Sequence, residues 1–168
     1  MQNELFSSAL TCLLCNDVES KLAQVTAIRL AWERGEITCQ PALNPAVPVP
    51  VPGRPAKPEM VSALAVDKRK LSTPEGRAAL IHSLAHIEFN AINLALDAIY
   101  RFRDLPQKYY EDWLQVAAEE ASHLSCCAII YTHWAMTTDL LQHITAYGKW
   151  RLLPRTTPWC AWHWCPEC

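Results

Sequence analysis

Three side chains in the middle of the sequence have the types and the spacing of metal ligands. Glu120 and His123 are three residues apart in "AAEEASHL", so a helix places both on one face. Glu88, in "LAHIEFNA", has apolar residues three and four positions away on either side, and a carboxylate on such a stripe is costly unless it is paired or binds a cation. Two carboxylates and one imidazole suit iron or manganese. The sequence therefore predicts an iron or manganese site at Glu88, Glu120 and His123.

Helical spacing also predicts which side chains face inward. The neighbours of Glu88 on its stripe are Ile81, Leu84, Ala85, Ala91, Ile92, Ala95 and Ile99. The neighbours of Glu120 are Trp113, Val116, Ala117, Leu124 and Cys127, whereas those of Glu119 are Asp112, Gln115 and Ser122. We therefore expect Glu120 and His123 to point into the core and Glu119 to point into solvent.

Other interpretations of these residues stay open at this point. Glu-x-x-His is common on helix surfaces that bind nothing, so a buried Glu–His pair with a purely structural role is the alternative to a metal site. His82 and His86 are four residues apart and can also hold a metal ion, but their helix face is mixed in polarity. We expect them to support the ligands rather than to be ligands. Cys12 and Cys15 form a C-x-x-C pair in an apolar helix, where core packing is the expected role.

Two long helices, predicted over residues 74–102 and from 106 to at least 124, must position the candidate ligands. The stretch "LSTPEGR" begins the first of them, because Pro74 suits the first position of a helix and either Thr73 or Ser72 can cap it. The stretch "RDLP" ends this helix and leads into the second. The short connection predicts that the two helices form an antiparallel hairpin.

The rest of the first 125 residues is predicted to cover this hairpin. Residues 3–34 have helical periodicity, with a break near Asn16 and Asp17. Residues 38–72 hold seven of the twelve prolines, which excludes a helix or a central strand and predicts an extended, Pro-rich strap across other elements. No strand-like alternation is present. The predicted fold class is therefore all-α, a helical bundle made of the hairpin, the N-terminal helix and the strap.

Charge and composition limit the function classes. The formal net charge of the 168-residue chain is −2, so no basic surface is implied and no nucleic-acid partner is expected. The start "MQNELFSSALTCLLC" lacks the basic residues of a signal peptide, and no apolar run reaches the length of a membrane span. We expect a cytoplasmic protein without a membrane partner.

Three stretches resemble one known family. "RPAKPEMV", "TPEGRAALIHSLAHIEFNAINLALDAIYRFRDLP" and "YYEDWLQVAAEEASHL" resemble the DUF455 family of bacterial ferritin-like proteins, up to about residue 125. The resemblance implies a ferritin-like four-helix bundle with a dinuclear iron or manganese centre, and it places Glu88, Glu120 and His123 at the ligand positions of the first half. By analogy with other ferritin-like proteins, full-length relatives are expected to be O₂-dependent oxidases or hydroxylases.

The second half of the family's ligand set has no counterpart in this chain. The family pattern carries a further Glu and a final D-E-x-x-H motif, but Asp139 and Glu167 are the acidic residues that follow His123. The bundle is therefore expected to be incomplete, and the chain inactive or a weak binder of one ion unless a second chain completes the site. The alternative is a non-catalytic binding or structural protein with a buried Glu–His cluster. Exposed apolar helix faces are expected to cause self-association.

The composition changes near residue 125. Residues 126–168 hold five of the eight cysteines and five of the seven tryptophans. Permitted codons for residues 126–150, read one nucleotide earlier, can encode the family-like "LLRDYLHTLGYDYGSFTAHNGLWEM". We therefore divide the chain into a ferritin-like domain, residues 1–125, and an atypical tail that we expect to be out of frame, helical at first over 126–145 and irregular at its end. The nucleotide sequence around codon 125 tests this hypothesis.

Overall fold

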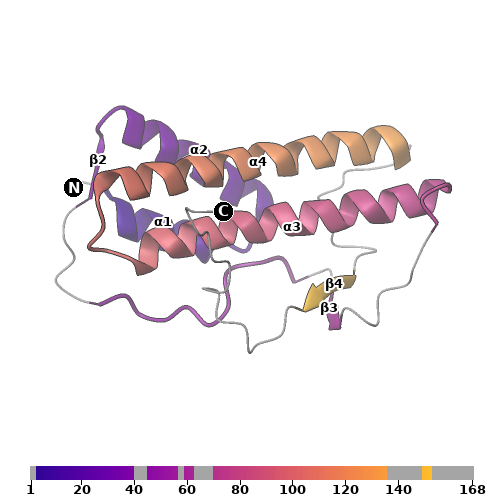
Figure 1. The fold of residues 1–168 in the computed structure, drawn as a ribbon, viewed down its shortest axis with the longest axis horizontal. Coiled ribbons are helices and arrows are strands. Elements are labelled where there is room, and N and C mark those ends of the chain that lie inside the picture. Colours follow the sequence, from indigo (N-terminus) through magenta and orange to yellow (C-terminus); the bar gives the residue numbers. More distant parts are fainter. Residues whose placement is uncertain (1–2, 40–44, 57–58, 63–69, 136–148, 153–168) are drawn as a thin grey trace, which may run out of the picture.

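The chain folds into an all-α bundle, which confirms the predicted fold class. A computed structural model describes residues 3–39, 45–56, 59–62, 70–135 and 149–152. The helices are α1 (Leu5–Leu13), α2 (Val18–Glu33), α3 (Pro74–Arg101) and α4 (Gln107–Ala135). In Figure 1, α3 and α4 lie side by side as a long hairpin, with α1 against α3 and α2 against α4 at the end that contains the turn. In the described part of the chain, no helix has an apolar stretch long enough to cross a membrane.

Local signals in the sequence set the start of α3. The side-chain oxygen of Thr73 accepts a hydrogen bond from the backbone N–H of Gly76 at 3.0 Å, and Pro74 follows in the first turn. Of the two predicted N-terminal caps of α3, Thr73 and Ser72, the structure therefore has Thr73. α3 ends at Arg101, one residue before the predicted end, and α4 runs past its predicted minimum to Ala135.

α4 is continuous across residue 125, where the composition of the sequence changes. Beyond that point Cys127 is buried and Tyr131 packs against the core. The predicted continuation of the helix into the tail is thus confirmed as far as Ala135, and residues 136–145 lie outside the described residues. The change in composition does not coincide with the end of a helix. The out-of-frame origin of the tail stays a prediction.

The N-terminal segment forms two helices with a break where the sequence predicted it. The side chain of Asp17 accepts a hydrogen bond from the backbone N–H of Ser20 at 2.8 Å and so caps α2. The ring of Phe6 on α1 meets the ring of Tyr110 on α4 edge to face, with 5.5 Å between centroids. The large apolar side chains that are almost fully buried come from all four helices: Leu5, Phe6, Leu13, Val25, Ile92, Leu96, Ile99, Tyr110, Leu114 and Leu124. This core fixes α3 against α4 and thereby the candidate ligands.

Two short parallel strand pairs depart from the prediction that the sequence contains no strands. β1 (Asn3–Glu4) pairs with β2 (Ile37–Thr38), and β3 (Glu59–Ser62) pairs with β4 (Lys149–Leu152). The expectation that about the last 20 residues are irregular is therefore wrong at β4, and residues 153–168 lie outside the described residues. The difference has a physical reason, because pairs of two to four residues are joined by backbone hydrogen bonds between distant segments and leave no periodicity in the sequence.

The described part of the Pro-rich strap lies across the helices, as predicted. The backbone N–H of Gly53 donates a hydrogen bond to the carbonyl of Leu13 at 2.8 Å, and that of Val47 donates to the hydroxyl of Tyr100 at 3.1 Å. A Cβ atom at Gly53 would lie 2.3 Å from the carbonyl carbon of Leu14, so this close approach of strap and α1 requires glycine.

A buried lysine joins the strap to the bundle. The ammonium group of Lys21, on α2, donates hydrogen bonds to the carbonyls of Leu13 (3.1 Å) and Gly53 (2.9 Å) and to Oδ1 of Asn93 (2.5 Å). It also lies 5.0 Å from the ring centroid of Phe89. Burial lowers the pKa of Lys21 to about 8. One charged side chain thus connects α1, α2, α3 and the strap.

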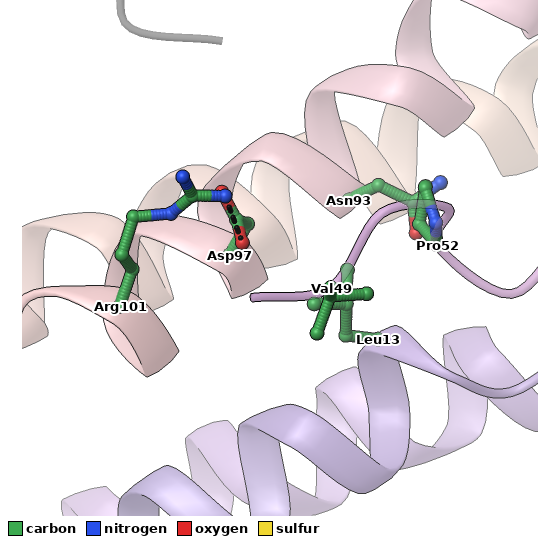
Figure 2. Close-up of a pocket in the computed structure, with 6 residues that line it drawn as sticks. All are labelled: Leu13, Val49, Pro52, Asn93, Asp97 and Arg101. Carbon is green, nitrogen blue, oxygen red and sulfur yellow. Dashed lines mark hydrogen bonds and ion pairs between the residues drawn. The ribbon is translucent and has the colours of Figure 1, made fainter. Parts of the chain in front are cut away.

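Beside this junction, α1 and the strap face α3 around a small pocket (Figure 2), lined by Leu13, Val49, Pro52, Asn93, Asp97 and Arg101. Asp97 and Arg101 form an ion pair of 2.7 Å along α3. The pocket has a volume of about 10 Å³, which is room for about one water molecule. This volume leaves no room for a larger ligand between α1, the strap and α3.

Replacing Lys21 by Met is expected to destabilise the protein by about 1–3 kcal/mol, because buried carbonyl and amide oxygens lose their donor. Lys108→Met is the matched control, since Lys108 lies on the surface beside Asp112 and its loss should leave the stability nearly unchanged. Urea denaturation of the three proteins measures both effects. Equal midpoints for the two variants would show that Lys21 does not hold the strap in place.

Candidate metal centre

The structure brings the three predicted ligands together at the middle of the hairpin. Glu88 comes from α3, and Glu120 and His123 come from one turn of α4. Nδ1 of His123 lies 3.2 Å from Oε2 of Glu120 and 3.9 Å from Oε2 of Glu88. One donor atom from each of the three side chains lies within 4.8 Å of the other two. We call these three residues the Glu–Glu–His cluster.

The cluster lies at the edge of the core rather than inside it. The side chains of Glu88 and Glu120 are 20% and 23% exposed, but that of His123 is 58% exposed. The prediction that His123 points into the core is therefore wrong. Leu84, which was expected on the buried stripe, is exposed as well. Among the described residues, α1 packs against α3 and α2 against α4, whereas the side chains of Leu84 and His123 lie on exposed parts of the hairpin.

The rest of the predicted pattern of burial is confirmed for its central residues. Five neighbours of Glu88 are buried, namely Ile81, Ala85, Ile92, Ala95 and Ile99. On α4, Ala117, Leu124 and Cys127 are buried beside Glu120. Glu119 is exposed, as predicted, and accepts a hydrogen bond from the side-chain amide of Gln115 at 2.6 Å. The two adjacent glutamates thus differ in role, and only Glu120 faces Glu88.

The two carboxyl groups of the cluster perturb each other. Burial, the hydrogen bond with Glu120 and the negative charge of Glu120 together raise the pKa of Glu88 from 4.5 to about 7, although His123 acts in the opposite direction. Two carboxyl groups that share a proton in this way mark a position where positive charge is favourable. A divalent cation can replace that proton and satisfy both carboxylates.

His82 and His86 do not join the cluster. Burial and the neighbouring charge of His82 lower the pKa of His86 to about 4, so His86 is neutral at physiological pH. Within the described ranges, the Glu–Glu–His cluster is the one group of three His, Cys, Asp or Glu side chains close enough to hold a metal ion. His82 and His86 are not members of that group, and their supporting role stays a prediction.

Cys127 is a neighbour of Glu120 whose position relative to Glu88 the sequence spacing does not predict. It lies two helical turns after Glu120 and is buried. Burial raises the pKa of its thiol, and the negative charge of Glu88 raises that pKa further. The sulfur of Cys127 is not among the donor atoms that converge in the Glu–Glu–His cluster, and its side chain packs in the core beside the carboxylates.

The donor set fits a first-row transition metal. Two donor atoms that each lie about 2.1 Å from one ion can be no more than about 4.2 Å apart. The two distances from Nδ1 of His123 satisfy this limit, and the donor atoms of the two glutamates lie within 4.8 Å of each other, close to it. Two carboxylates and one imidazole form a mixed oxygen and nitrogen shell that suits iron or manganese and leaves coordination positions open.

Comparisons with known proteins match a segment that overlaps the predicted ferritin-like domain, residues 1–125, and extends beyond residue 125 to residue 137. A family model described as "Protein of unknown function (DUF455)" matches residues 14–137. An uncharacterized protein of Haemophilus influenzae is 40% identical over 122 residues, which are 68% of this chain and 39% of that relative. The chain thus matches about two fifths of the length of this relative. No solved structure was found to match.

Proposed function

We propose that this chain, which belongs to the DUF455 family, is a metal-binding protein of the ferritin-like class that holds iron or manganese at Glu88, Glu120 and His123. One observation carries the proposal. Two half-buried carboxyl groups and an imidazole from two packed helices converge within 4.8 Å, and the pKa of one carboxyl is raised toward neutrality. Clusters of perturbed titratable groups are typical of functional sites.

Each residue of the cluster has a separate task in this proposal. Glu88 and Glu120 supply negative charge that a divalent cation neutralises, and Glu88 releases its shared proton as the ion binds. His123 supplies the nitrogen donor from the solvent-exposed side, where an ion can enter. The buried stripes of α3 and α4 hold the carboxylates at a fixed separation and keep water from reaching them through the core.

Bound iron or manganese would supply redox chemistry toward O₂, which is the basis for proposing an oxidase or hydroxylase in this family. We assign that activity to full-length relatives rather than to this chain alone. The chain supplies three donors from two helices, whereas dinuclear carboxylate bundles use donors from four helices. This chain by itself is expected to bind one ion and to be inactive.

A purely structural role for the cluster is the competing function. A Glu–His pair that only fixes packing gains most when it is buried and fully paired, but the side chain of His123 is 58% exposed. The exposure favours a role in which His123 remains accessible to an incoming ion. The two functions differ in their response to metal.

Titration with Mn(II), or with Fe(II) under anaerobic conditions, tests the proposal. At a free metal concentration of 100 times Kd, binding should stabilise the protein by about 2.7 kcal/mol. For a chain of this size that is a rise in Tm of about 5–10 °C, and metal analysis after gel filtration should find about one ion per chain. A Tm that does not respond to either metal, with no ion retained, would support the structural role instead.

A further inference from the structure

The Glu–Glu–His cluster is one half of a symmetric ligand set. A dinuclear carboxylate bundle uses a Glu from each of two helices and a Glu-x-x-His pair from each of two others. In this chain α3 supplies one such Glu, Glu88, and α4 supplies one such pair, Glu120 and His123. A second copy of the same hairpin, related by a twofold axis, would supply the remaining members with the same residue types.

We propose that a second copy of this chain docks on the open side of the hairpin and completes the metal centre, an inference that rests on the proposed function. The surface that meets the partner is formed by Leu80, Leu84 and Ile87 of α3 and Ile130 of α4, which we call the open face. These side chains are between 37% and 59% exposed. Apolar side chains in a row beside a polar cluster are typical of interaction surfaces.

Helical geometry places the open face next to the ligands. Leu80, Leu84 and Ile87 follow one another at spacings of four and three, and Leu84 lies one turn before Glu88. Ile130 lies two turns after His123 on the corresponding side of α4. In Figure 1 this half of the hairpin extends beyond α1 and α2. Docking a second hairpin here would cover both the apolar row and the exposed imidazole.

The negative charge of the cluster makes the association of two chains depend on bound metal. Each chain brings two carboxyl groups to the cluster, and because metal binding removes their shared proton, two metal-loaded chains bring four negative charges to the interface. Two divalent cations balance these charges, whereas without metal the carboxylates of the two chains repel one another. In a dimer with two divalent ions, the charges of the ions and of the four carboxylates therefore sum to zero. We infer that the chain is a monomer without metal and a dimer with two ions.

Sedimentation velocity of the full chain, with and without Mn(II), tests the inference. Mn(II) should convert a monomer into a dimer that contains two ions. Ile130→Lys places a charge on the open face and should weaken the dimer at least tenfold without removing a ligand. Ile129→Lys is the matched control, because the exposed Ile129 lies on a different side of α4 and its replacement should leave the dimer intact.

The outcomes separate this inference from the proposed function. A monomer that binds one Mn(II) would overturn the dimer and leave the metal site standing, with another part of the chain covering the open face. A chain that binds no Mn(II) would overturn both. A dimer that forms equally without metal, or that survives Ile130→Lys unchanged, would show that the chains associate through a different surface.

Discussion

Replacing Glu120 by Gln is expected to weaken the binding of Mn(II) or Fe(II) by about 100-fold or more, whereas Glu119→Gln should change the affinity less than about twofold. A 100-fold loss corresponds to about 3 kcal/mol, which is reasonable for removing a charged ligand from a half-buried cluster. Glu120 lies beside Glu88 and His123, but the adjacent Glu119 is exposed and bonded to Gln115.

This pair of variants is a stringent test because the two positions are neighbours and the chemical change is the same. Both substitutions remove one negative charge from the same helix turn, so any effect of net charge on metal affinity is common to both. Isothermal titration of the two variants and the parent chain measures the difference. Equal losses at the two positions would show that the ion is held by the general charge of α4 rather than by the cluster.

Replacing Glu88 by Gln is expected to stabilise the metal-free protein at pH 8 and to destabilise it relative to the parent when Mn(II) is present. The folded chain raises the pKa of Glu88 from 4.5 to about 7. Between these values the folded chain holds a proton that the unfolded chain has released. The stability that protonated Glu88 contributes is therefore complete below pH 4.5 and is lost as the pH rises through about 7.

The Glu88→Gln variant has no charge at this position, so it should escape this loss, with a gain on the order of 2 kcal/mol at pH 8 that disappears near pH 4. Saturating Mn(II) should reverse the order, because only the parent chain has both carboxylates. Thermal denaturation at pH 4 and pH 8, the latter with and without Mn(II), measures these differences. If the variant is less stable than the parent in metal-free buffer at pH 8, the two carboxyl groups do not repel each other in the folded chain.

The sequence was sufficient to predict the cluster because all three side chains obey helical periodicity. Glu88 interrupts an apolar stripe, and Glu120 and His123 share a turn, so no knowledge of distant contacts was needed to expect their convergence on a hairpin. The start of α3 was predictable for the same reason, since Thr73 and Pro74 act within their own turn.

Features that depend on distant segments were not predictable from local spacing. The exposure of His123 depends on which face of the hairpin α1 and α2 cover, and that choice is made by core residues far away in the sequence. The burial of Lys21 was missed, although its position three residues after Val18 and four before Val25 placed it on the apolar face of α2. Its partners come from three other segments of the chain.

The central claim is that His123 binds the ion directly together with Glu88 and Glu120. Electron spin echo envelope modulation of the Mn(II)-loaded chain tests it, because the method detects a nitrogen nucleus bound to the metal. We expect modulation from one histidine nitrogen that is lost in His123→Ala and retained in His82→Ala and His86→Ala. Modulation that survives His123→Ala, or that is absent from the parent chain loaded with Mn(II), would contradict this claim.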